Sequence, residues 1–130
     1  MTTEDFGVAC VIPTHGRPDF LREALTSVLA QTAPVREIVV IADDDEPASA
    51  AVVADVTASA DVPVTYVRRL DGPPGASASR NAGARATSSP WIAFLDDDDV
   101  WEPGYVAAAA QATALHPEAT ALVTPFYRFT

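Results

Sequence analysis

Short apolar segments rich in β-branched residues alternate along the chain with segments of helical periodicity. The β-branched segments cover residues 8–12, 37–42, 62–67 and 91–95, with a weaker one at residues 121–126. The first four show little alternation of polar and apolar residues, which is typical of strands buried on both faces of a parallel sheet. Helical spacing of apolar residues marks residues 19–31 and, more weakly, residues 48–60. Residues 77–87, which are rich in small residues, and residues 103–115, which contain an alanine run, are predicted as two further helices. This order predicts an α/β fold with an open, mostly parallel sheet and helices on both faces.

The length and apolar content indicate one domain that covers residues 1–130. A chain of 130 residues with 48% hydrophobic residues can bury roughly two-thirds of the surface that its unfolded form exposes. Neither an internal repeat nor a linker divides it. Because no helix or cap follows the last predicted strand, we expect the chain to be a piece of a longer protein.

The charge balance limits the kinds of ligand that the chain can bind. Eight arginines stand against 18 acidic residues, which gives a net charge of −10, and the sequence contains no lysine. An acidic chain lacks the basic face that binding to a nucleic acid backbone needs, so we expect no nucleic acid partner. Without lysine, a phosphate group must be neutralised by arginine, by backbone N–H groups or by a divalent metal ion.

The single cysteine and the lack of targeting signals point to an ordinary cytoplasmic protein. Cys10 lies among the apolar residues 8–12, so we interpret it as a buried core thiol, and a disulfide within the chain is impossible. No segment reaches the length of about 18 apolar residues that a membrane span requires. The first residues lack the basic and apolar regions of a signal peptide. We therefore expect a cytoplasmic location.

The polar residues that can do chemistry follow the predicted strands. These loops are residues 13–18, 43–47, 70–75 and 96–99. In an open α/β sheet, ligands bind outside the carboxyl ends of the strands, near the point where the strand order reverses. The carboxylates of residues 43–45 and 96–99 should therefore lie at one edge of the sheet.

The run of four aspartates at residues 96–99 needs a compensating partner if it is partly buried. Two like charges 4 Å apart repel by about 1 kcal/mol in water and by about 4 kcal/mol at an effective dielectric of 20. A divalent cation such as Mg²⁺ or Mn²⁺ offsets this repulsion and keeps positions open for a diphosphate. The alternative is a solvated acidic loop whose carboxylates favour the N-terminus of the next helix. Residues 43–45 can likewise bind a nucleoside or cap the helix that follows them.

Other residues in the same loops leave two or more interpretations open. His15 can be a ligand, a platform for a base or a simple turn residue. Arg80 can meet a diphosphate or form an ion pair within the protein. The turn at residues 72–75 is weak support for phosphate binding. Trp91 and Trp101 are typical of core or lid packing.

Four segments resemble the family-2 glycosyltransferases, which have the GT-A nucleotide-sugar-binding fold. Residues 11–21, VIPTHGRPDFL, resemble the usual opening V-I-P-T-Y-N-R-P-x-x-L, and residues 25–32 are similar to the helix L-x-S-V-L-x-Q-T. Residues 75–83 resemble the segment G-x-x-x-A-R-N-x-G, and residues 91–101 resemble the D-x-D region. The four matches come in the family's order and cover the chain almost from end to end.

The resemblance implies a site for a nucleoside-diphosphate sugar, with UDP or dTDP types favoured. On this sequence, that site comprises Pro13, Thr14, His15, Asp43, Asp71, Arg80, Asp96 and Asp97. It also implies that Asp98 and Asp96 bind Mg²⁺ or Mn²⁺, which stabilises the leaving diphosphate. The implied reaction is the transfer of a sugar to an acceptor hydroxyl, with inversion. The general base and the acceptor-binding half of the family lie beyond residue 130, so we expect the chain to carry donor binding alone.

The chain departs from the family pattern at several positions. His15 and Gly16 replace the usual Tyr and Asn, and Asp44 and Asp45 replace a Gly and a Ser near the ribose contacts.

One alternative to a glycosyltransferase is a nucleotide-sugar-binding module without catalysis. A sugar nucleotidyltransferase typically has a Gly-rich loop with Arg and Lys after the first strand, whereas residues 13–18 contain one glycine and no lysine. A receiver domain needs a lysine, and a dinucleotide-binding oxidoreductase needs a G-x-G-x-x-G segment after the first strand; the chain has neither.

Overall fold

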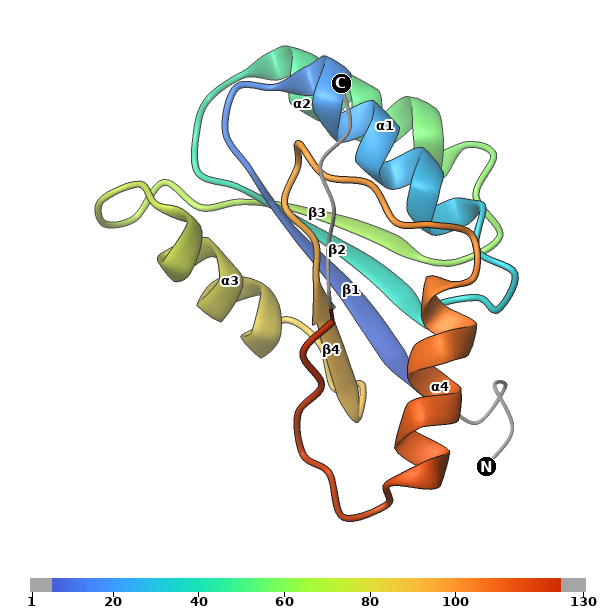
Figure 1. The fold of residues 1–130 in the computed structure, drawn as a ribbon. Coiled ribbons are helices and arrows are strands. Elements are labelled where there is room, and N and C mark those ends of the chain that lie inside the picture. Colours follow the sequence, from blue (N-terminus) through green and yellow to red (C-terminus); the bar gives the residue numbers. More distant parts are fainter. Residues whose placement is uncertain (1–5, 125–130) are drawn as a thin grey trace.

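The computed structural model describes residues 6–124, which form a parallel sheet with helices on both faces (Figure 1). The strands are β1 (Val8–Thr14), β2 (Glu37–Ala42), β3 (Val64–Arg68) and β4 (Trp91–Phe94). The helices are α1 (Pro18–Leu29), α2 (Pro47–Thr57), α3 (Ala76–Arg85) and α4 (Tyr105–Leu115). The strand order is β3-β2-β1-β4 and every pairing is parallel. The predicted fold class is confirmed.

Local signals set the helix boundaries. Pro18 and Pro47 occupy the first turns of α1 and α2, where a missing N–H costs nothing and the fixed φ suits a helix. The Glu46 side chain caps α2 by accepting a hydrogen bond of 3.0 Å from the backbone N–H of Ala48. Helix α4 begins at Tyr105, two residues later than predicted.

The predicted fifth strand is not found where the structure can test it. Residues 121–124 have no regular secondary structure, and residues 125 and 126 lie outside the described residues. The prediction rested on a short β-branched run. A strand also needs a partner to satisfy its backbone hydrogen bonds, and no strand pairs with residues 121–124 in the described part of the chain.

Two hydrophobic layers hold the helices against the sheet. On one face, α1, α2 and α4 pack over a core that contains Cys10, Ile12, Ile38 and Val40 of the sheet. On the other face, α3 packs through Ala82 on a smaller cluster made by Val11, Val39 and Ile41. Figure 1 shows this division, with α3 alone on its side of the sheet. The prediction of helices on both faces therefore holds, with three helices on one face and one on the other.

The degree of strand burial depends on position in the sheet. All residues of β1 and nearly all of β2 are buried, as predicted. Strands β3 and β4 are only half-buried, because each has a neighbour on one side alone in the described sheet. Cys10 is fully buried, which confirms the interpretation of Cys10 as a core residue, and this burial raises the pKa of its thiol.

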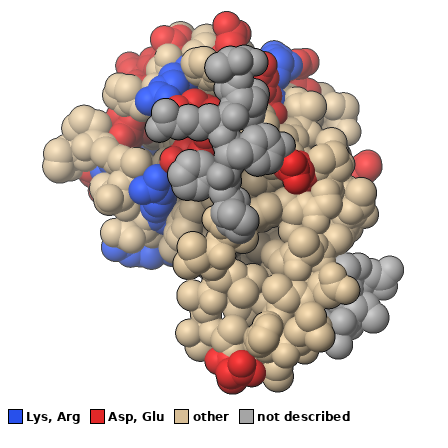
Figure 2. All heavy atoms as spheres, in the orientation of Figure 1, with Lys and Arg blue, Asp and Glu red and all other residues tan. Residues whose placement is uncertain are grey.

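Charged groups are distributed unevenly over the surface. In the face shown in Figure 2, acidic and basic side chains crowd the upper part, and the lower part around α4 is nearly free of charge.

Trp101 is buried and stacks on Tyr105 of α4 with ring centroids 4.5 Å apart. Within residues 6–124, no helix has both the length and the apolar character needed to cross a bilayer.

Candidate functional site

The carboxyl ends of β1, β2 and β4 meet around a cleft of about 200 Å³. The chain passes from β1 to β2 and β3 on one side and then places β4 on the other side of β1. The cleft therefore lies at the point of order reversal, where open α/β sheets bind ligands. Its lining residues are Pro13, Thr14, His15, Arg17, Asp43, Ala76, Ser79, Arg80, Asp96, Asp97 and Asp98.

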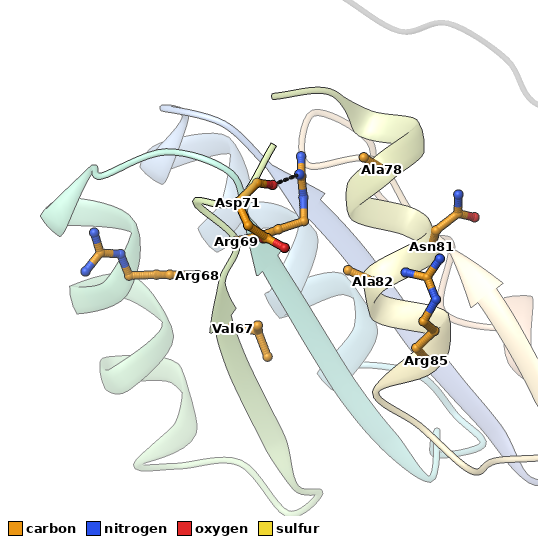
Figure 3. Close-up of a pocket in the computed structure, with 8 residues that line it drawn as sticks. All are labelled: Val67, Arg68, Arg69, Asp71, Ala78, Asn81, Ala82 and Arg85. Carbon is orange, nitrogen blue, oxygen red and sulfur yellow. Dashed lines mark hydrogen bonds between the residues drawn. The ribbon is translucent and has the colours of Figure 1, made fainter. Parts of the chain in front are cut away.

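The structure brings together all the predicted site residues except Asp71. That residue lines a separate hollow of about 380 Å³ between β3 and α3, with Val67, Arg69, Asn81 and Arg85 among its walls (Figure 3). Asp71 is exposed, and its backbone carbonyl accepts a hydrogen bond from Arg69 Nη1 at 3.0 Å. The resemblance to the family implied a place for Asp71 around the base and the diphosphate, whereas in the structure Asp71 lines the hollow between β3 and α3.

Asp97 is the innermost carboxylate of the acidic run. It is 6% exposed and accepts hydrogen bonds from Thr14 Oγ1 at 2.9 Å and from the backbone N–H of His15 at 3.3 Å. Arg17 Nη1 lies 3.6 Å from its other oxygen. These contacts join the loop after β4 to the end of β1, so Asp97 shapes the cleft from inside.

The other carboxylates of the run form a compact group at the surface. Carboxylate oxygens of Asp96, Asp98 and Asp99 all lie within 4.8 Å of one another. Arg80 pairs with Asp96 at 2.6 Å and Arg17 pairs with Asp98 at 3.0 Å. Burial and then the negative charges of Asp98, Asp96 and Asp97 raise the pKa of Asp99. The group therefore has more negative charge than its two arginines neutralise.

Asp43 is the centre of a second cluster on the opposite wall. Its side chain is 5% exposed; one oxygen faces His15 Nδ1 at 2.6 Å and the other accepts a hydrogen bond from the backbone N–H of Gly75 at 2.6 Å. Burial opposes ionisation of Asp43, but the hydrogen bonds from His15 and Gly75 and the charges of His15 and Arg69 outweigh it and lower its pKa. The hydrogen bond to Asp43 is the main reason that the pKa of His15 is raised.

The carboxylates after Asp43 mainly organise their own loop. Asp44 accepts hydrogen bonds from the backbone N–H of Glu46 at 3.0 Å and from that of Gly16. Asp45 pairs with Arg68. Neither residue caps α2, whose N-cap is Glu46, although Asp44 makes a local hydrogen bond just before the helix. Asp43, in contrast, lines the cleft.

The sequence reading missed Arg17, Ser79 and Asp99 as parts of this site. Arg17 belongs to the loop 13–18, which the sequence already placed at the carboxyl end of the first strand. Its position in that loop could therefore have identified it as a residue of the site. Asp99 is the last carboxylate of a run from which the D-x-D pattern selected Asp96 and Asp98. Ser79 is a buried helix residue whose role depends on how α3 is oriented, and nothing local in the sequence shows that.

These features define the class of the domain, and comparison with known sequences then defines the family. A parallel α/β sheet with an acidic cleft at its point of order reversal is the architecture of a nucleotide-binding α/β domain. Residues 9–130 match the sequence profile of glycosyl transferase family 2. The chain belongs to that family, as the resemblance of its motifs implied.

One relative by sequence and two solved structures are similar to this chain. The succinoglycan biosynthesis protein ExoW of Rhizobium meliloti (strain 1021) is 34% identical over 103 residues, which are 78% of this chain and 32% of that protein. The fold is similar to that of S. aureus TarS 1-349 in complex with UDP-GlcNAc, with a TM-score of 0.76, 19% identity and coverage of 85% of this chain and 32% of TarS. The mannosyltransferase PcManGT from Pyrobaculum calidifontis, in complex with GDP-Man and Mn²⁺, gives a TM-score of 0.74 at 21% identity, with coverage of 82% and 32%. The chain thus spans about a third of the length of each.

Proposed function

We propose that the cleft at the ends of β1, β2 and β4, which we name the donor cleft, binds a nucleoside-diphosphate sugar of the UDP or dTDP type together with Mg²⁺ or Mn²⁺. In this proposal the chain is the donor-binding part of an inverting glycosyltransferase, which transfers the sugar to an acceptor hydroxyl. The observation that carries it is the convergence of two carboxylate clusters and two arginines on one cleft. The UDP-GlcNAc of one structural neighbour and the GDP-Man and Mn²⁺ of another support a nucleoside-diphosphate sugar and a divalent cation as the ligands.

The surface carboxylates fit a divalent cation. Asp96, Asp98 and Asp99 offer oxygen donors close enough to share one ion, and hard cations such as Mg²⁺ and Mn²⁺ prefer oxygen ligands. Burial and then the neighbouring carboxylates raise the pKa of Asp99, and a bound cation would offset the repulsion from those carboxylates. Relative to the sequence reading, which chose Asp98 and Asp96, the proposal adds Asp99. When bound, the ion acts as a Lewis acid that stabilises the leaving diphosphate.

The remaining residues of the cleft bind and orient the donor. Arg80 and Arg17 are the cations that can pair with diphosphate oxygens, for which their planar forks are well suited. Asp43 can accept hydrogen bonds from a base or a ribose, and His15 covers that wall with an exposed ring. Asp97 holds the β1 and β4 loops together beneath the ligand.

We assign no general base to the described residues. As the resemblance to the family implies, the residue that deprotonates the acceptor belongs, in this proposal, to a part of the protein outside residues 1–130. The cytoplasmic location expected from the sequence also stays a prediction. The rival function is a module that binds the donor without transferring it, and a transfer assay with the full-length protein separates the two.

A thermal-shift panel with UDP, dTDP, GDP and CDP, each with and without Mn²⁺ or Mg²⁺, tests donor binding. We expect UDP or dTDP to raise the melting temperature only when the metal is present. At a ligand concentration 100 times the Kd, the stabilisation is about 2.7 kcal/mol. Asp98→Asn should abolish the shift, because it removes a ligand of the ion.

The matched control is Asp61→Asn, which makes the same change at an exposed aspartate between α2 and β3. This variant should keep the full shift. A folded wild-type protein that responds to none of the four nucleotides contradicts the proposed function. If a nucleotide raises the melting temperature equally with and without metal, the proposed cation site is wrong.

A further inference from the structure

Arg69 connects three segments that meet behind the donor cleft. It is the first residue after β3, and its backbone N–H donates a hydrogen bond of 2.6 Å to the carbonyl of Ala42 at the end of β2. Its side chain is only 10% exposed. A guanidinium that is largely removed from water needs several partners inside the protein.

The guanidinium finds those partners in the loop 71–75 and in α3. Nη1 donates to the carbonyl of Asp71 at 3.0 Å, and Nη2 donates to the carbonyl of Pro73 at 3.1 Å. Nε donates to Ser79 Oγ at 3.4 Å. Figure 3 shows the Arg69 side chain turned toward this loop, whereas the neighbouring Arg68 points to the other side of β3.

The same side chain also reaches the acidic wall of the cleft. Nη2 lies 3.8 Å from Asp43 Oδ2, the oxygen that accepts the hydrogen bond from the Gly75 N–H. Gly75 ends the loop and has a φ of 152°, and α3 begins at the next residue. Arg69 and Asp43 thus hold the loop 71–75 from both sides, and the loop's own side chains are exposed.

We propose that Arg69 is a positioning residue for donor binding, which fixes the loop 71–75 and the start of α3 against Asp43. Arg69 does not line the donor cleft, but Asp43, Ala76 and Ser79 do. It therefore acts on the ligand through the residues that it holds. This inference rests on the proposed function, because the cleft must bind a nucleotide for the positioning to matter.

The chemistry of the contacts requires arginine at this position. Two backbone carbonyls, one hydroxyl and one carboxylate surround a planar group whose donors point in fixed directions. A lysine keeps the charge near Asp43 but offers a single ammonium, which cannot reach all of these acceptors at once. Arg69→Lys therefore removes the arrangement of hydrogen-bond donors and keeps the positive charge, whereas Arg69→Gln removes both.

The test compares Arg69→Lys and Arg69→Gln with the wild-type protein in two measurements. Calorimetry with UDP and Mn²⁺ gives the Kd, and amide hydrogen exchange of the free protein reports the hydrogen bond from Gly75. We expect both variants to weaken UDP binding about tenfold, the effect of losing hydrogen bonds that involve a charged group. The Gly75 amide should exchange at least ten times faster, and lysine should not rescue either property.

Two control variants separate positioning from general effects. Arg68→Gln removes the same charge and one ion pair, that with Asp45, from the other side of β3, so UDP affinity and Gly75 exchange should stay within twofold of wild type. Ile38→Val lowers the melting temperature through the core without touching the cleft, and it should leave the UDP affinity unchanged.

Distinct outcomes overturn the two proposals. If Arg69→Lys matches the wild type in both UDP affinity and Gly75 exchange, the positioning role of Arg69 is wrong. If the wild-type protein binds none of the nucleotides, the proposed function fails. In that case Gly75 exchange in Arg69→Lys still decides whether Arg69 fixes the loop. Should Arg69→Gln fail to fold, Arg69→Lys and Ser79→Ala, which removes the acceptor of Nε, carry the comparison.

Discussion

His15 and Asp43 form a pair whose strength depends on pH. The pKa of His15 is raised, so its contribution to stability is fully present below the ordinary value of about 6.5 and is lost as pH rises through the raised value. The pKa of Asp43 is lowered, so the interaction between His15 and Asp43 is also lost at acidic pH, as pH falls through that lowered value. NMR titration of the His15 ring in metal-free protein should therefore give a pKa above the ordinary range.

Substitution of the partner checks the cause of this shift. Asp43→Asn removes the carboxylate that holds the His15 proton, so the pKa of His15 should return toward its ordinary value. Asp55→Asn removes one negative charge on α2 that pairs with Arg22 instead, and it should leave the His15 titration in place. A raised pKa that persists in Asp43→Asn contradicts the assignment of the hydrogen bond.

Ser49 and Ser79 are buried helix serines with opposite expectations. Ser49 is fully buried on α2, and its Oγ has no hydrogen-bond partner among the described residues. Ser49→Ala removes an unsatisfied hydroxyl and improves helix propensity, so it should stabilise the fold by about 0.5–1 kcal/mol. Ser79→Ala removes the acceptor of Arg69 Nε and should destabilise it by about 0.5–1.5 kcal/mol. Urea unfolding of both variants measures the contrast; equal destabilisation would mean that Ser49 has a partner.

At the level of elements, the approach of α3 to the sheet depends on the missing side chain of Gly83. A Cβ placed at Gly83 would overlap Val11 Cγ1 and lie 3.2 Å from Ile41 Cγ1. Because β1 and β2 are fixed at the centre of the sheet, α3 must move outward to admit the methyl group. We expect Gly83→Ala to destabilise the fold by about 1–3 kcal/mol, although alanine is the better helix former. Asn81→Ala, at an exposed position of the same helix, should change the stability by less than about 0.5 kcal/mol. Similar urea midpoints for the two variants would contradict this packing argument.

At the level of the whole molecule, excess negative charge opposes the compact state. The net charge is −10, and much of it sits at the edge of the sheet where two carboxylate clusters converge. Salt screens this repulsion, since the Debye length falls from about 30 Å at 0.01 M to about 10 Å at 0.1 M ionic strength. We expect the melting temperature of the metal-free protein to rise with NaCl over this range. A fall would show that exposed ion pairs such as Arg22–Asp55 outweigh the repulsion.

The sequence predicted those features that depend on residues close together in the chain. β-branched runs, helical periodicity in residues 19–31 and 48–60, and helix-forming composition in residues 77–87 and 103–115 identified all eight elements of residues 6–124. Each of these signals lies within the element that it predicts. It also placed the aspartates of residues 96–99 and Asp43 at one edge, since parallel strands share a carboxyl end. It failed for residues 121–124, where a β-branched run has no partner strand.

The tertiary structure alone decided what each polar side chain in the cleft contacts. Thr14 and Asp97 are 83 residues apart in the chain, and their hydrogen bond exists because β4 pairs with β1 in one particular register. Asp71 lines the hollow between β3 and α3 and not the cleft, and Arg69 meets Ser79 because α3 folds back beside the end of β3. Periodicity within a segment gives the side of the element on which a residue lies. The direction of a side chain at a strand end, and hence its partner, depends on how separate elements pack together.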